Sequence, residues 1–275
     1  MHTRFMAKRY IALARIFVAS FGCAGVGWGL VNLPNFGRQA SMEYVARHII
    51  RGESYKIEAL KQLIPVMEAA ENAAICRPAA LWSAAIVRLR MFEESEKSSQ
   101  QIKLLDHSMR LSLSCSPAEP FLWLALYSAE SAQNGFKPEY LKYLRMSYQL
   151  GPNEGWIILK RNSIALRDFD WLPADLAADA INEFVALLNN ELYSQAVDIF
   201  SGAAWWVQQA IVPHLADLPQ RIRESFARAI YEKGLDIIIP GVSPPSSKPR
   251  WSNGFMEPHE GVGGARTVPV RVTLD

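Results

Sequence analysis

The sequence predicts an all-α protein of antiparallel helix pairs stacked on one another, with one membrane-spanning helix before them and a disordered tail after them. The chain has 275 residues, of which 50% are hydrophobic, enough to bury a sizeable core. From residue 38 to residue 234, apolar side chains recur at spacings of three and four, which is the helical period, and no segment alternates like a strand. The two ends differ from this body: the first is apolar and the last is rich in Pro, Gly and Ser.

The N-terminal segment resembles a membrane signal anchor. Residues 1–9 are basic, and residues 10–33 are apolar, with no charge after Arg15. As a helix rising ~1.5 Å per residue, residues 16–33 would cover roughly 27 Å, close to the ~30 Å core of a bilayer. The positive cluster predicts a cytoplasmic N-terminus and a body outside the inner membrane, in the periplasm of a bacterium.

Two alternatives remain open for this segment. Ser20 and Gly22 before Cys23 also suit a secretory signal that is cleaved, which would release a soluble secreted binding protein. A lipoprotein signal cut before Cys23 is a special case, in which Phe21 and Ser20 stand where such signals usually carry a small residue and a leucine. If the helix is retained, Gly25 and Gly29 stand four apart on one face and form a candidate dimer face for a homodimer in the membrane. The plainer explanation is that glycine is common in membrane helices.

The charge distribution argues against a nucleic-acid partner. The formal net charge is +2, but Arg4, Lys8, Arg9 and Arg15 all precede the first acid, Glu43. Without these four, the chain carries 25 basic and 27 acidic residues. A basic binding face is therefore not expected.

A recurring junction divides the body at 38–234, which follows a short predicted break at residues 34–37. The sequences CRPAALW, CSPAEPFLW and LGPNEGW share a helix end, a proline and a tryptophan, and their prolines are Pro78, Pro117 and Pro152. The intervals of 39 and 35 residues match two helices and two turns. Because neither helix can bury its apolar face alone, consecutive pairs are expected to stack. Pro65 predicts a kink or an early stop inside its helix.

Residues 41–189 resemble the tetratricopeptide-repeat family. The resemblance rests on the aromatic and small positions of one unit and on the turn after it: Trp123, Leu126, Tyr143, Met146 and Gly151-Pro152. It implies a right-handed solenoid of helix pairs whose concave face holds a partner protein or peptide. Less regular helices are expected after the repeats, at 173–188, 191–200, 205–212 and 219–233, followed by the disordered tail at 235–275.

The sequence contains no catalytic, cofactor or metal motif that we recognise. The five histidines are dispersed, no serine lies in a nucleophile elbow, and no phosphate loop is present. Cys76 and Cys115 both stand two residues before a repeat proline. We expect equivalent positions in stacked pairs to lie about 10 Å apart, beyond the reach of a disulfide, so both are interpreted as packing residues.

Four tryptophans form the candidate interaction surface: Trp156, Trp171, Trp205 and Trp206. Flat aromatic faces stack on sugar rings and on proline-rich peptides, although tryptophans that recur with a repeat also fill helical cores. Trp205 and Trp206 point about 100° apart on a helix, so we expect one of them to be exposed.

These observations predict a membrane-anchored periplasmic scaffold or adaptor that mediates protein–protein interaction in a cell-envelope assembly. The assembly that we expect is one for the biosynthesis or export of surface polysaccharide. We expect no enzymatic activity and no cofactor. The rival interpretation is an envelope carbohydrate-active enzyme that uses unrecognised acids such as Glu154, Asp168 and Asp170.

Overall fold

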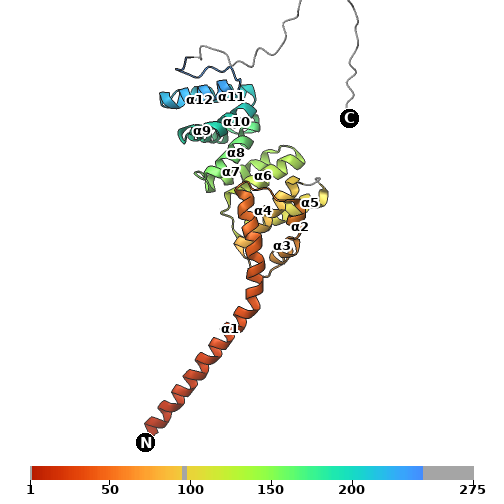
Figure 1. The fold of residues 1–275 in the computed structure, drawn as a ribbon, viewed down its shortest axis with the longest axis vertical. Coiled ribbons are helices and arrows are strands. Elements are labelled where there is room, and N and C mark those ends of the chain that lie inside the picture. The colour runs from red at the N-terminus through yellow and green to blue at the C-terminus, as the bar shows by residue number, and fades with distance from the viewer. Residues whose placement is uncertain (1, 95–97, 244–275) are drawn as a thin grey trace, which may run out of the picture. The chain divides into compact units, whose positions relative to one another are not determined.

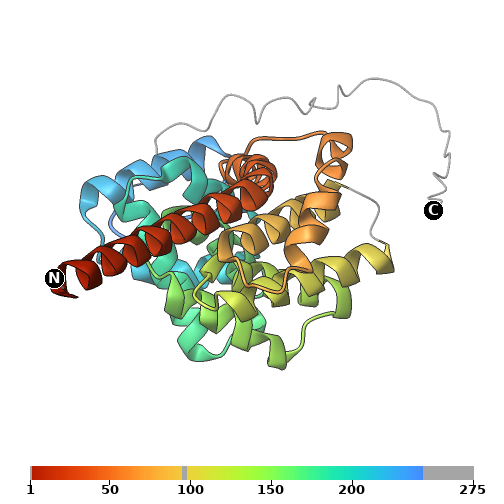
Figure 2. The same cartoon turned by 90° about the horizontal axis from the view of Figure 1, so that it is seen from below.

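The computed structural model describes residues 2–94 and 98–243, and within the first helix the side chains of residues 2–14, 31–36 and 38 lie outside this description. Over the described residues every regular element is a helix and no strand is present (Figures 1 and 2). The predicted all-α class is therefore confirmed. The chain divides into two compact units, one of residues 1–164 with 170–176, and one of residues 165–169 with 177–275.

The first helix, α1 (His2–Ile50), is continuous for 49 residues. In Figure 1 its N-terminal part extends away from the helices that follow it in the first unit, whereas its last turns pack on α3 and α4. Met42 and Ala46 are fully buried there. The predicted break at residues 34–37 is wrong: Pro34 removes one backbone donor, but the hydrogen bonds on both sides carry the helix through.

Among the described side chains, no helix holds an apolar run of the length and hydropathy that a membrane crossing needs. Within the span predicted at residues 10–33, the described side chains of α1 run from Arg15 to Leu30, so the span continues outside them at both ends.

Pro65 divides the next helix, as the sequence predicts. The chain forms α2 (Ile57–Lys61), turns, and restarts as α3 (Ile64–Glu71) with the proline in the first turn. A proline fits there because the first N–H groups of a helix have no intrahelical acceptor.

Two antiparallel hairpins follow in the first unit. The first joins α4 (Pro78–Glu94) to α5 (Ser99–Cys115), and the second joins α6 (Pro120–Asn134) to α7 (Leu141–Leu150) through the short η1 (Pro138–Tyr140). The helices of each hairpin pack along each other, and α5 also packs on α6. A capping box at Ser98 starts α5: its hydroxyl accepts the Gln101 N–H, and the Gln101 side chain accepts the Ser98 N–H.

The hairpins share one apolar core with the end of α1. Fully buried side chains from the seven helices α1 to α7 form its centre: Met42, Leu60, Met67, Ile86, Leu105, Met109, Leu122, Tyr127 and Leu144. Most of these are the residues that the helical period places on the inner stripes.

A buried ion pair fastens α3 to the first hairpin. The Arg88 guanidinium donates two hydrogen bonds to the Glu71 carboxylate, at 2.8 and 2.7 Å, and Ser108 Oγ donates a third at 2.5 Å. Only 7% of either charged side chain is exposed. Helices α3, α4 and α5 therefore meet at one hydrogen-bonded polar cluster. The bidentate contact between Arg88 and Glu71 fixes how α3 and α4 are aligned.

The turn after α7 is closed by α8 (Gly155–Arg167). Arg161 is fully buried and donates to the carbonyl oxygens of Ser147 and Gly151, at 2.6 and 2.9 Å, so it caps the end of α7. A Cβ atom on Gly151 would lie 2.7 Å from Pro120 Cγ at the start of α6. The close approach explains why a glycine stands in the predicted turn.

The second unit is a smaller helical cluster. The short η2 (Phe169–Trp171) is split by the division into units, and most of α9 (Ala174–Asn189) lies in the second unit. Three further α-helices follow: α10 (Tyr193–Gly202), α11 (Trp205–Ile211), which continues into η3 (Val212–Leu215), and α12 (Gln220–Glu232). Phe184, Phe200 and Phe226 are fully buried and meet with ring centroids 5.4–5.7 Å apart. These helices lie close to the ranges that the sequence predicts.

The chain stays ordered past the predicted start of the tail at residue 235. Ile239 is buried, and Arg223 of α12 donates a hydrogen bond to the Pro240 carbonyl oxygen at 2.5 Å. Gly241 then adopts a φ of +71°, a conformation that favours glycine. Apolar burial against α12 therefore fixes residues 235–243, and the rest of the predicted tail, 244–275, lies outside the described residues.

Candidate functional site

A pocket of about 110 Å³ lies among the helices that lead each pair in the first unit. The end of α1 contributes Ile49 and Ile50, α4 contributes Ile86 and Leu89, and Gly52, Glu53, Arg90, Glu93, Phe121 and Lys160 complete the lining. The floor is therefore apolar and the rim is charged. Sequence reasoning missed this pocket because Ile86 and Leu89 have the helical spacing of core residues, and the other lining residues come from helices distant in sequence.

An aromatic and cationic edge borders the pocket. The ring of Phe121 packs against that of Trp156, with centroids 4.9 Å apart, and Lys160 Nζ lies 5.8 Å from the Phe121 centroid. Trp156 keeps 37% of its surface exposed, whereas Phe121 keeps 6%. Lys160 has no carboxylate partner in the part of the chain that the structure describes, so its charge is available at the rim.

The other charges of the rim are paired. Arg90 contacts Glu93 at 3.2 Å and Glu94 at 2.6 Å, and Glu53 lies 3.7 Å from His48 Nε2. These exposed pairs are screened by water and add little stability. Lys160 is therefore the rim cation best placed to meet an acidic group of a ligand.

Two glutamates lie close to each other where α6 and α8 begin. Burial raises the pKa of Glu119, and the nearby charge of Glu154 raises it further, against the opposing effect of a hydrogen bond with Ser116. Acids at helix starts also interact favourably with the helix dipole. Among the other acids proposed for the rival enzyme, Asp168 is held by Arg167 at 2.9 and 3.0 Å.

The four candidate tryptophans do not form one surface within either unit. Trp156 and Trp171 belong to the first unit, and Trp205 and Trp206 belong to the second. Trp171 is 63% exposed and stacks on Phe136, with centroids 5.2 Å apart. Within the first unit, Trp156 is the candidate that lies beside the pocket, through its contact with Phe121.

Trp205 and Trp206 are both exposed, at 67% and 49%. Their rings meet edge to face, with centroids 6.4 Å apart, at the start of α11. Because this helix has only seven residues, it buries Val207 and Ile211 and leaves both indoles on its outer side.

Gly25 and Gly29 lie on the extended part of α1. A Cβ atom added at either position would meet nothing within 4 Å in the described single chain. The proposed dimer face is thus open, and the dimer itself remains a prediction.

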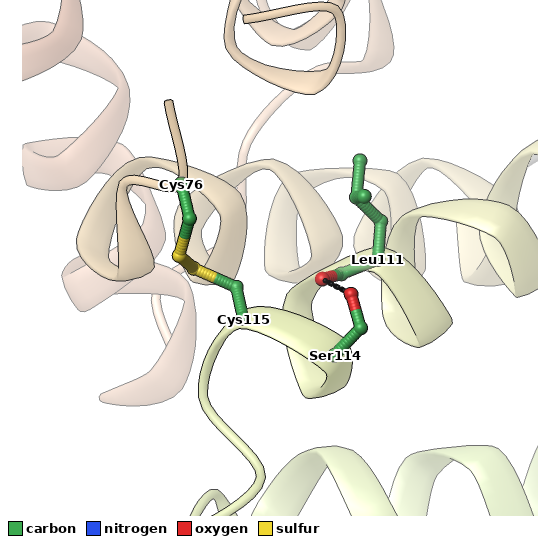
Figure 3. The surroundings of a disulfide bond; sticks show 4 residues. All are labelled: Cys76, Leu111, Ser114 and Cys115. Carbon is green, nitrogen blue, oxygen red and sulfur yellow. Dashed lines mark hydrogen bonds between the residues drawn. A yellow bond between two sulfur atoms is a disulfide. The ribbon is translucent and has the colours of Figure 1, made fainter. Parts of the chain in front are cut away.

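The largest departure from the sequence-based expectation is a disulfide between Cys76 and Cys115, whose Cα atoms are 5.8 Å apart (Figure 3). The expected separation of about 10 Å treats the two residues as equivalent points in successive pairs. In fact Cys76 precedes the first helix of the α4–α5 hairpin and Cys115 ends the second. An antiparallel hairpin brings its two ends together. The positions of Cys76 and Cys115 at two successive junctions therefore predict that the two cysteines lie close to each other.

Among the described residues, no three histidine, cysteine or acidic side chains come together in a way that would hold a metal ion. The arrangement that remains is an apolar pocket with an aromatic edge and one unpaired cation. Such a site binds a ligand by apolar contact and orients it through a charge. Comparisons of the chain with protein-family models, with curated proteins and with solved structures found no match.

Proposed function

We propose that this protein is a single-pass scaffold of the bacterial inner membrane, with α1 as its anchor and a periplasmic helical-repeat body that binds a partner protein. The pocket among α1, α4, α6 and α8 is the observation that carries the binding role. Its apolar floor and its Lys160 and Trp156 edge suit an apolar peptide segment that bears an acidic group.

The extended part of α1 supports the anchor. Large apolar side chains on all sides of this helix are more than 60% exposed in the single chain: Ile16, Phe17, Val18, Phe21, Val26, Trp28 and Leu30. Water disfavours such a surface, and a bilayer covers it. We propose that the helix spans the membrane with residues 1–9 in the cytoplasm.

The Cys76–Cys115 bond supports a periplasmic body. Disulfides persist in oxidising compartments and are rare in the cytosol, where thiols are kept reduced. With the basic N-terminus inside, a single span places the hairpin on the oxidising side of the membrane.

Within this role, our prediction from the sequence is an assembly that builds or exports surface polysaccharide. Deletion of the gene is then expected to lower the amount of surface polysaccharide, and complementation to restore it. Unchanged polysaccharide would remove this assignment and leave the scaffold proposal intact.

Site-specific photocrosslinking in intact cells tests the binding role. A photoreactive amino acid in place of Glu53, an exposed residue of the pocket rim, leaves Lys160 intact and is expected to give a discrete adduct with one partner protein. The adduct should disappear when Leu89→Glu places a charge on the apolar wall. The matched control is the same photoreactive group in place of Lys103, an exposed residue of α5. Identical adducts from both positions, or an adduct that survives Leu89→Glu, would contradict the proposed pocket.

A further inference from the structure

We propose that Cys76 is the entry thiol at which a disulfide-donating oxidoreductase forms the Cys76–Cys115 bond. This assigns a modification site and a class of partner that are separate from the binding pocket. The inference does not depend on the scaffold role.

The two sulfurs differ in their access to another protein. Cys76 is exposed in the segment between α3 and α4, whereas Cys115 is half-buried as the last residue of α5 (Figure 3). An incoming oxidoreductase must place its own disulfide in line with the attacking sulfur. The exposed loop gives that room at Cys76.

The two positions also differ in their electrostatic surroundings. Cys76 lies two residues before Pro78, the first residue of the 17-residue helix α4, and Arg77 is its neighbour. A helix N-terminus and a guanidinium both stabilise a thiolate, which is the reactive form. Cys115 lies at the C-terminal end of α5, where the carbonyl dipoles disfavour a negative charge.

The reaction takes place in two balanced steps. In the reduced chain, the Cys76 thiolate attacks the donor disulfide, forms a mixed disulfide and releases one donor sulfur as a thiolate. Cys115 then gives up its proton to water and attacks Cys76 Sγ, which expels the second donor sulfur. The two cysteines lose two electrons and two protons in total, and the donor disulfide is reduced to a dithiol. The α4–α5 hairpin favours the second step because it holds the two Cα atoms 5.8 Å apart.

The test uses the full chain in detergent with Cys23→Ser, and oxidised glutathione as the probe. One variant adds Cys115→Ser and keeps Cys76; the other adds Cys76→Ser and keeps Cys115. Mixed-disulfide formation at pH 7, followed by mass spectrometry, is expected to be at least about threefold faster at Cys76. Arg77→Gln should slow the reaction at Cys76, and Lys103→Gln, on the exposed side of α5, should not.

Two further measurements separate reactivity from loss of structure. The rate difference should shrink in concentrated urea, because unfolding removes the helix N-terminus and the difference in access and leaves only the neighbouring Arg77. If either single-cysteine variant loses helical circular dichroism, the reduced Cys23→Ser chain is quenched early by alkylation, and peptide mapping locates the first glutathione adduct. That adduct is expected on Cys76. An equal or faster reaction at Cys115, or a rate difference in urea as large as in the folded chain, would overturn the proposal.

Discussion

Cys76 and Cys115 close a loop with a sequence separation of 39 residues around the α4–α5 hairpin. A covalent link of this kind stabilises the fold chiefly by restricting the unfolded chain, and a loop of this length corresponds to roughly 4 kcal/mol in the chain-entropy model. The bond also fixes the segment that leads from α3 into α4, beside the buried pair of Glu71 and Arg88. The first hairpin is thus held by a covalent link as well as by a buried ion pair.

We expect the double substitution Cys76→Ser and Cys115→Ser to lower the free energy of unfolding by about 2–5 kcal/mol. Urea unfolding followed by circular dichroism measures the change, and reduction of the native chain should reproduce it. The control is Cys23→Ser, since Cys23 is a free exposed thiol in α1. Equal stability of the oxidised and reduced chains would show that the bond does not constrain the body.

Glu119 makes a pH-dependent contribution. Its pKa is raised by burial and by the charge of Glu154, so the folded chain holds this proton more tightly than the unfolded chain does. The resulting stability is present below the ordinary glutamate pKa of about 4.3 and is lost as the pH rises through the folded value. At neutral pH the ionised Glu119 is therefore unfavourable to the fold.

Glu119→Gln is accordingly expected to raise the melting temperature at pH 7 and to leave it unchanged near pH 3. Thermal unfolding at both values measures the difference. Glu68→Gln, an exposed acid on α3, is the control. A variant that is less stable than the native chain at pH 7 would mean that Glu119 acts mainly as a favourable acid at the start of α6.

The junction between the second hairpin and α8 depends on close backbone approach. Gly151 leaves room for Pro120, and Arg161 binds the carbonyl groups at the end of α7. These contacts explain how the Gly-Pro turn positions α8, and with it Trp156 and Lys160, at the edge of the pocket.

Gly151→Ala is expected to destabilise the first unit by about 1–3 kcal/mol, because the new methyl group overlaps the Pro120 ring. Gly155→Ala at the start of α8 is the matched control, since a Cβ atom there meets nothing within 4 Å. Comparison of the two unfolding midpoints tests the contact. Equal midpoints would show that the turn relaxes without cost.

At the level of elements, sequence periodicity was sufficient to predict most helices. The inner stripes of α5 and α7 and the division at Pro65 follow from local rules, because apolar spacing and proline geometry act within one or two turns. Continuation through Pro34 was not predicted, since a proline disfavours a helix without forbidding it. The ordered segment at 235–243 was missed because its burial depends on distant contacts with α12.

The candidate site was less predictable than the fold. Of the two candidate tryptophans in the first unit, Trp156 lies at the pocket and Trp171 stacks on Phe136, because exposure and proximity depend on how helices distant in sequence pack. The disulfide, by contrast, could have been predicted from the spacing of the two junctions. The expected separation of about 10 Å was wrong because it treated Cys76 and Cys115 as ends of neighbouring hairpins, whereas they are the two ends of one hairpin.

In the proposed whole molecule, the apolar helix α1 anchors a disulfide-bonded body that carries a binding pocket. The anchor would cover the exposed apolar surface of α1, and a periplasmic body would place the Cys76–Cys115 bond in an oxidising compartment, where such bonds persist. A membrane span with the N-terminus inside would provide both.

Protease accessibility on the two sides of the inner membrane tests this arrangement most directly. Spheroplasts and inverted inner-membrane vesicles are treated with the same protease, and the helical body is followed by an antibody, with one cytoplasmic and one periplasmic protein as controls. We predict that the body is digested in spheroplasts and protected in inverted vesicles. Digestion in inverted vesicles alone, or recovery of the whole chain in a soluble fraction, would contradict the proposed topology.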